Sequence, residues 1–334
     1  MPLMRALRLT EPGRFEIVEL ERPHPGEGQV LLHVDAATIC NQHDLRQWRG
    51  EARRYPCEPG FPGHEGAGTV VAVGPGVRGL AVGDRVVTSG IGGEPLYREY
   101  VLRRQEAVAR VTGPSLPAAH LAPLELFGCA RRALGHAGRL AQKRVGVVGL
   151  GPAGIAAVML LRLEAPGEIV GIDLSAERRQ RALSAGADRV LDGALFLGLH
   201  EAAGRRLSGE STAEDAELLR RAEELALEVV FDCTGSARAL ESSFLLARSE
   251  LVIFGFVKEP GRFLQAAWFA RELVIRNSKI LTLDDLHAVA RLTSWGLLTP
   301  GLLVTHVLPF HRYAEALELV AQGRALKVAL VWDE

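Results

Sequence analysis

The chain has 334 residues, of which 48% are hydrophobic and 24% are charged, a composition typical of a folded globular protein of about two domains. Its 39 basic and 40 acidic residues leave a net charge of −1, which argues against binding to nucleic acid. The four cysteines form no CxxC pair, and neither a secretory signal nor a membrane span is apparent, so we expect a cytoplasmic protein without disulfides.

The first 110 residues predict short strands separated by turns rich in glycine and proline. We expect these strands at residues 14–19, 29–36, 65–73, 84–88 and 100–102. Many short strands joined by tight turns are typical of an irregular β-barrel.

Strands and helices alternate from about residue 126. Helical spacing is found at residues 127–141, 154–164, 176–185 and 212–228, the last of which begins with a weak capping box of Thr212 and Asp215. Strands are expected at residues 144–148, 169–173, 189–191, 229–233 and 251–256. This alternation predicts a parallel sheet covered by helices on both faces.

The C-terminal part returns to mixed structure. Strands are expected near residues 274–281, 304–307 and 327–331, and helices near residues 283–295 and 313–321. The fold class predicted for the whole chain is therefore α/β, with a barrel and a doubly wound sheet.

A dinucleotide-binding pattern, GxGxxG, follows the strand at residues 144–148 and opens the next helix. Its glycines allow a tight turn, close approach of a pyrophosphate, and close packing of helix on strand. Asp173, at the end of the next strand, is placed to accept hydrogen bonds from the adenosine ribose, which favours NAD over NADP. Arg178 and Arg179 lie close by and keep NADP as the alternative. The expected contact residues of the loop are Gly149, Leu150, Gly151, Pro152, Ala153 and Gly154.

A second candidate site lies in the glycine-rich segment around residues 60–93. His64 and Glu65 occur there in the sequence Gly-His-Glu-Gly, and Cys40 lies 24 residues before His64. A thiolate, an imidazole and a carboxylate are typical ligands of a catalytic zinc ion. Each of these residues alone is weak evidence, because isolated Cys and His residues are more often structural.

Residues 63–87, G-H-E-G-A-G-T-V-V-A-V-G-P-G-V-R-G-L-A-V-G-D-R-V-V, followed some 60 residues later by GxGxxG, closely resemble the zinc-containing medium-chain dehydrogenase/reductase family. This is the family of alcohol, sorbitol and threonine dehydrogenases. The sequence Y-R-E-Y-V at residues 97–101 resembles the family's F-A-E-Y-V strand, and the resemblance extends from about residue 5 to residue 331. It implies a GroES-like catalytic domain, residues 1–126 and 277–334, enclosing a Rossmann NAD-binding domain, residues 127–276.

The resemblance also implies roles for particular residues. Cys40 and His64 match the first two zinc ligands, and Glu125 matches the third, with Cys129 as the competing candidate. Glu65 matches a carboxylate that can approach the metal transiently. Two further residues match supporting positions: Asp44 the acid that buttresses the ligand histidine, and Lys327 a basic position near that glutamate and the cofactor phosphates.

Two departures from the family pattern are visible. The segment Cys40-Asn-Gln-His-Asp44 has one residue more than the usual C-G-[ST]-D and lacks the hydroxyl that relays the substrate proton. His43 can take over that relay or can merely line the cleft. Residues 88–96 carry no cysteine, so a structural zinc ion is not expected.

The function implied is oxidation of a secondary alcohol, polyol or cyclitol to a carbonyl compound, with one catalytic zinc ion and NAD. A small-molecule alcohol or ketone is the expected substrate, and a homodimer or homotetramer the expected assembly. Two alternatives stay open: a zinc-free enone or quinone reductase of the same fold that uses NAD(P)H, and a non-catalytic NAD-binding protein.

Overall fold

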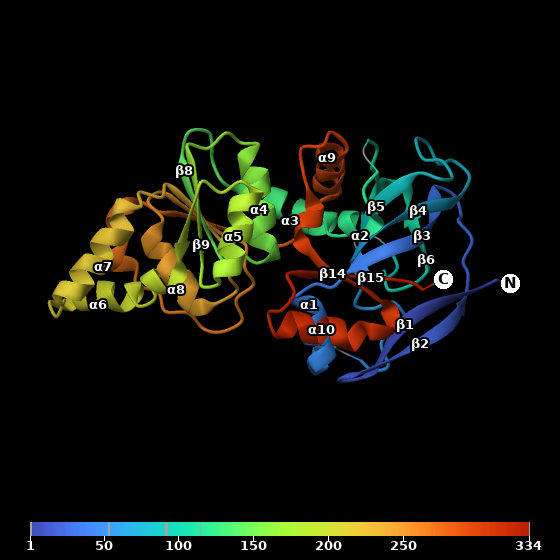
Figure 1. Ribbon diagram of the computed structural model, residues 1–334, viewed down its shortest axis with the longest axis horizontal. Helices are drawn as coiled ribbons and strands as arrows, with labels where there is room; N and C mark the ends of the chain where they lie inside the picture. The colour runs from blue at the N-terminus through green and yellow to red at the C-terminus, as the bar shows by residue number, and fades with distance from the viewer. Residues whose placement is uncertain (1, 53, 91–92, 114, 334) are drawn as a thin grey trace. The chain divides into compact units, whose positions relative to one another are not determined.

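The computed structural model describes residues 2–52, 54–90, 93–113 and 115–333, and it divides into two compact units (Figure 1). The first unit comprises Met1–Gly128 and Leu281–Glu334, and the second comprises Cys129–Ile280. The predicted α/β class is confirmed, since one unit is built on a mainly antiparallel sheet and the other on a parallel one. Among the described residues, no helix is long and apolar enough to cross a membrane.

The first unit is a barrel-like arrangement of strands that range from three to ten residues. A seven-stranded sheet has the order β14-β15-β3-β4-β5-β7, with β6 paired to β3, and a separate hairpin joins β1 to β2. The strands are β1 (Leu3–Glu11), β2 (Arg14–Glu21), β3 (Gln29–Thr38), β4 (Glu65–Val73), β5 (Arg85–Ser89), β6 (Tyr100–Arg104), β7 (Val108–Arg110), β14 (Val304–Pro309) and β15 (Lys327–Val331). β15 pairs with both β14 and β3, so the C-terminal segment completes a sheet that the N-terminal segment begins.

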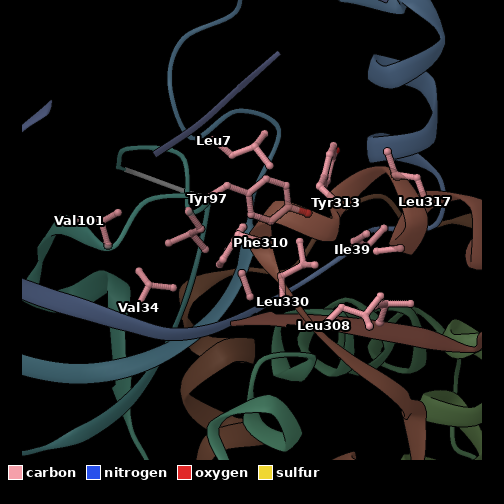
Figure 2. Close-up of a cluster of buried hydrophobic side chains, with 14 of the residues drawn as sticks. Leu7, Val34, Ile39, Tyr97, Val101, Leu308, Phe310, Tyr313, Leu317 and Leu330 are labelled. Atoms are coloured by element: carbon pink, nitrogen blue, oxygen red, sulfur yellow. The ribbon is translucent and has the colours of Figure 1, made fainter. Parts of the chain in front are cut away.

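The helices of the first unit range from four to twelve residues, apart from α3, which continues into the second unit. They are α1 (His43–Arg46), α2 (Ala118–Leu121), the start of α3 (Leu124–His136), α9 (Leu283–Ser294) and α10 (Tyr313–Ala321). The core of this unit gathers side chains from both chain segments, as Figure 2 shows for Leu7, Val34, Leu308 and Leu330. The core therefore joins the two segments although they are far apart in sequence.

The second unit holds six parallel strands in the order β10-β9-β8-β11-β12-β13. This is the strand order of a doubly wound dinucleotide-binding sheet. The strands are β8 (Arg144–Val148), β9 (Glu168–Asp173), β10 (Arg189–Asp192), β11 (Val229–Asp232), β12 (Glu250–Ile253) and β13 (Val274–Asn277). The helices are α4 (Pro152–Arg162), α5 (Ala176–Ala185), α6 (Leu199–Ser208), α7 (Ala213–Glu224) and α8 (Ala237–Leu246).

Several predicted elements differ from those observed. The helix expected at residues 127–141 is α3, which begins one turn earlier and so takes Glu125 into its first turn. The helix expected at residues 212–228 ends at Glu224, because residues 225–228 lead into β11. The strand expected at residues 274–281 ends at Asn277 and forms the sixth strand of the parallel sheet.

The connection between β5 and β6 is held by buried arginines. Arg103 donates to Thr88 Oγ1 at 3.0 Å and to the carbonyl of Glu94 at 2.6 Å. Arg98 forms ion pairs with Glu58 and Glu94, both at 2.8 Å. This is the segment where we expect no structural zinc ion, and its residues 91–92 lie outside the described part of the chain.

Candidate active site

Cys40, His64 and Glu65 come together because β3 and β4 are antiparallel neighbours. Ala37 near the end of β3 pairs with Gly66 at the start of β4, so the residues just beyond β3 meet those that enter β4. One ligand atom on each of the three side chains lies within 4.8 Å of the other two. The donor set, a sulfur, a nitrogen and a carboxylate oxygen, suits a zinc ion.

The ring of His64 is oriented by its own loop. Its Nδ1 lies 2.9 Å from the carbonyl oxygen of Pro62, so Nδ1 carries the proton and Nε2 is left to bind a metal. The loop can lie this close only because of glycine: a Cβ at Gly90 would stand 2.7 Å from the Cβ of His64, and one at Gly63 would stand 2.6 Å from the backbone nitrogen of Tyr97.

The surroundings of His64 are electrically negative. Burial disfavours the protonated imidazole, but a hydrogen bond and charge from Cys40, with the charges of Glu125 and Glu65, raise the pKa of His64 well above its usual value. A site that favours a proton on a buried imidazole in this way also favours a bound cation.

Glu65 and Lys327 form a buried ion pair at the edge of this cluster. Lys327 Nζ lies 2.6 Å from both carboxylate oxygens of Glu65 and donates to the carbonyl of Ile39 at 2.8 Å. The hydroxyl of Thr38 also donates to Glu65. Burial disfavours the charged ammonium, but Glu65 and Cys40 outweigh this effect and raise the pKa of Lys327. The structure thus places Lys327 on Glu65, inside the candidate metal site.

The two candidates for the third ligand lie one turn apart on α3, and both are buried. The charge of Glu125 raises the pKa of His64 and that of Lys327, so its carboxylate lies within electrostatic range of the cluster. Cys129 is the first residue of the second unit. The ligand atoms that lie within 4.8 Å of one another belong to Cys40, His64 and Glu65, so Glu125 stands near this group and outside it.

Two buried polar atoms beside Cys40 have no hydrogen-bond partner within the described residues, namely Asn41 Oδ1 and His43 Nδ1. The ring of His43 packs edge-on against His64, with the ring centres 5.1 Å apart, and against Phe61. Burial, followed by the charges of His64 and Arg46, lowers the pKa of His43 to about 4. The neutral imidazole of His43 and the amide oxygen of Asn41 are each available for a hydrogen bond. Such groups are expected beside a bound metal ion or a substrate hydroxyl.

Asp44 lies beside the ligand histidine, with a carboxylate oxygen within 4.8 Å of a ring nitrogen of His64. Its carboxylate accepts from the hydroxyls of Tyr97 and Tyr313 and from the backbone N–H of Cys40, while His64 Nδ1 faces Pro62. Sequence reasoning did not single out either tyrosine, because nothing local marks a contact made across the whole first unit.

The dinucleotide pattern forms the turn between β8 and α4. Gly149 adopts a φ of +86°, Gly151 is the N-cap of α4, and Pro152 opens the helix. A Cβ on Gly154 would stand 1.9 Å from the carbonyl oxygen of Gly149, so only glycine fits there. The first backbone N–H groups of α4 are left without partners inside the helix, as phosphate binding requires.

Asp173 ends β9 beside this turn. Its carboxylate accepts hydrogen bonds from the backbone N–H groups of Leu150 at 2.7 Å and Ser175 at 2.8 Å. Arg179 donates to the carbonyls of Asp173 and Leu174 and pairs with Asp192, whereas Arg178 lies in the first turn of α5. The turn, the helix terminus and the carboxylate therefore occupy one end of the parallel sheet.

The chain is similar to several known proteins in sequence and in fold. Residues 26–117 match the model of the alcohol dehydrogenase GroES-like domain. The chain is 25% identical to the starvation-sensing protein RspB of Escherichia coli, over 99% of this chain and 100% of that protein. It is 27% identical to sorbitol dehydrogenase of Ovis aries, over 96% and 94% of the two chains. The crystal structure of rspB from E. coli CFT073, complexed with NADH, shares the fold with a TM-score of 0.81, covering 99% of this chain and 100% of that one at 23% identity.

Proposed function

The chain belongs to the medium-chain dehydrogenase/reductase family, and on that premise we propose that it is a zinc-dependent dehydrogenase of secondary alcohols, polyols or cyclitols. It is an oxidoreductase, and NAD is the proposed hydride acceptor, with a ketone reduced in the reverse direction. The observation that carries the proposal is the cluster of Cys40, His64 and Glu65, whose ligand atoms lie within 4.8 Å of one another.

Cys40, His64 and Glu125 are the residues that we propose to hold zinc. A zinc ion bound there would polarise the substrate oxygen as a Lewis acid. Glu65 could also bind the zinc ion, but its carboxylate is already bonded to Lys327 and Thr38. We therefore propose Glu125 as the permanent third ligand.

His43 is the residue that we propose to move the proton. Its ring lies beside that of His64, with the ring centres 5.1 Å apart, and Nδ1 has no partner within the described residues. When an alcohol is oxidised, the hydride leaves from carbon and the hydroxyl proton passes to His43 Nδ1 or to water, and reduction of a ketone reverses both transfers.

NAD is favoured over NADP by Asp173. A carboxylate at the end of β9 accepts hydrogen bonds from ribose hydroxyls and repels a 2′-phosphate. The backbone N–H of Leu150 holds Oδ2 of Asp173 at the turn that follows β8, and the N–H of Ser175 holds Oδ1 at the end of β9. Arg178 and Arg179 are the groups that would favour NADP instead.

We further propose that the chain assembles as a homodimer or homotetramer through the edge strand β13. This strand is the last in the order of the parallel sheet, and its residues Val274 and Ile275 are exposed. An exposed apolar edge strand is a surface on which a second copy can pair.

Metal analysis and a substrate panel test the proposed activity. We expect close to one zinc ion per chain after gentle purification, and less than about half an ion per chain would overturn the zinc assignment. The panel pairs NAD with polyols, cyclitols and secondary alcohols and follows NADH absorbance. Turnover of enones by zinc-free protein would establish the reductase alternative, and NAD binding without any turnover would establish a non-catalytic role.

Alanine substitutions decide the third ligand. We expect Glu125→Ala to lose zinc during dialysis and Cys129→Ala to retain it. The two residues lie one turn apart on the same helix and are similarly buried, so each variant serves as the packing control for the other. Loss of zinc from Cys129→Ala alone would assign the ligand to Cys129.

A further inference from the structure

Asp44 is the centre of a buried polar cluster that the proposed reaction does not use. Its side chain is fully buried. Oδ1 accepts hydrogen bonds from the hydroxyl of Tyr97 and, at 3.3 Å, from that of Tyr313. Oδ2 accepts from the backbone N–H of Cys40 at 3.3 Å. These uncharged donors replace the hydrogen bonds to water that the carboxylate loses on burial.

The two phenol groups are held rigidly. The rings of Tyr97 and Tyr313 are 5.6 Å apart at an interplanar angle of 65°, and both are completely buried. Figure 2 shows the hydroxyl end of Tyr97 directed toward Tyr313 within the apolar core. Phe310 packs against Tyr97, and Phe15 packs against Tyr313. Neither hydroxyl can leave Asp44 without disturbing this packing.

Asp44 in turn fixes the backbone around Cys40. The carbonyl of Cys40 accepts a hydrogen bond from the backbone N–H of Asp44 at 3.1 Å. The backbone N–H of Cys40 in turn donates a hydrogen bond to the Asp44 carboxylate. The backbone N–H of His43 points to Cys40 Sγ at 3.4 Å. The N–H and the carbonyl of Cys40 thus both form hydrogen bonds with Asp44. A carboxylate oxygen of Asp44 also lies within 4.8 Å of a ring nitrogen of His64.

We propose that Tyr97 and Tyr313 are positioning residues for the metal centre, acting through Asp44 on the loop that carries Cys40. This inference rests on the zinc site of the proposed function. Each tyrosine contributes one hydroxyl to the Asp44 carboxylate. Substitution by phenylalanine removes that hydroxyl and keeps the ring.

The test measures metal affinity in the absence of substrate. Wild-type protein, Tyr97→Phe and Tyr313→Phe are stripped of metal and titrated with Zn²⁺ in competition with a chromophoric chelator. We expect the dissociation constant of Zn²⁺ to rise about tenfold in Tyr97→Phe, as for other groups that orient metal ligands. We expect a smaller rise, about threefold, in Tyr313→Phe, because its hydrogen bond to Asp44 is longer.

Co²⁺ supplies a second readout. We expect its sulfur-to-metal absorption band, which reports the bond to Cys40, to shift or weaken in both variants. If Tyr97→Phe does not fold, Tyr313→Phe decides the question with the same two measurements.

Tyr55→Phe is the matched control. The hydroxyl of Tyr55 also donates a hydrogen bond within the first unit, but to the carbonyl of Gln47. We expect Zn²⁺ affinity and the Co²⁺ spectrum to be unchanged in this variant, whatever happens to its thermal stability. Equal loss of affinity in Tyr55→Phe, or affinities of both test variants within about twofold of wild type, would overturn the inference. If wild-type protein binds neither ion, the proposed function itself fails.

Discussion

The ion pair of Lys327 and Glu65 holds two opposite charges where each side chain is only 2% exposed. Removing one charge from such a pair leaves the other buried without compensation, which is far more costly than losing a surface pair. We expect Lys327→Met to lower the free energy of unfolding of the metal-free protein by about 3–5 kcal/mol, as measured by urea denaturation.

Lys143→Met is the control for this prediction. Lys143 lies 3.2 Å from Glu250 and is 25% exposed, and Glu250 also accepts hydrogen bonds from Gly138 and Arg276. We expect a loss of no more than about 1 kcal/mol in this variant. Equal losses in the two lysine variants would show that Glu65 is not the charge left uncompensated.

Asp173 is expected to set the preference between the two nicotinamide cofactors. Asp173→Asn removes the negative charge and keeps an oxygen acceptor for one of the two backbone N–H groups, those of Leu150 and Ser175, that now bond to separate carboxylate oxygens. We expect the ratio of the NADPH to the NADH dissociation constant to fall about tenfold, equivalent to ~1.4 kcal/mol, as measured by cofactor fluorescence. Asp192→Asn, which alters the partner of Arg179, is the control and is expected to leave the ratio unchanged. A wild-type protein that binds NADPH as tightly as NADH would refute the assignment.

Only some residues of the candidate site could be predicted from local sequence patterns. His64 is recognisable because an imidazole stands in a glycine-rich pattern, whereas Cys40 was assigned through the family resemblance. The contacts of Asp44 with Tyr97 and Tyr313 span 53 and 269 residues of sequence. No periodicity or spacing predicts such contacts, since only the folding of the two segments onto one sheet brings them together.

Among the elements, α7 begins as its sequence predicted. Thr212 accepts from the backbone N–H of Asp215, and the Asp215 side chain accepts from the N–H of Thr212, which completes a capping box. Arg205 of α6 also donates to both oxygens of Asp215, at 2.8 and 2.5 Å. These donors connect the start of α7 to α6.

This connection has a pH dependence. The hydrogen bond from Arg205, followed by those of Thr212, holds the pKa of Asp215 well below its ordinary value of 3.8. Because the pKa is lower in the folded state, the stabilisation is present above pH 3.8 and is lost as the pH falls below it. We expect the free energy of unfolding of wild type to exceed that of Asp215→Asn at pH 7, and the difference to shrink toward pH 3. A difference that stays constant across this range would contradict the assignment.

Helices and strands were predictable where the spacing of hydrophobic residues and the turn-forming residues at the ends of the segment indicated the same element. β8, β9 and α5 lie where their buried runs and flanking turns indicated. Helix α6 was not anticipated, because left-handed glycines at Gly198 and Gly209 bound it and make the segment look like a loop. Strand β1 was missed as well, since Arg5 and Arg8 interrupt its apolar residues and its pairing with β2 is what orders it.

At the scale of the molecule, the parallel sheet ends in the exposed strand β13, whose first two residues are apolar and whose last two are Arg276 and Asn277. Val274 and Ile275 of β13 are 42% and 37% exposed, and Phe269 just before them is 69% exposed. An isolated strand of this kind would invite uncontrolled association, which proteins commonly avoid with charged edge residues or by covering the edge. We interpret β13 as the surface that a second copy of the chain covers.

Ile275→Lys tests this interpretation by placing a charge on the edge strand. We expect light scattering coupled to size-exclusion chromatography to give a dimer or tetramer for wild type and a smaller species for the variant, since a buried unpaired lysine disfavours pairing. Leu207→Lys is the control, because Leu207 is an exposed apolar residue on helix α6 of the same unit, 52% exposed against 37% for Ile275, and we expect it to leave the mass unchanged. A monomeric wild type would refute the proposed assembly, and an Ile275→Lys variant of unchanged mass would place the interface elsewhere.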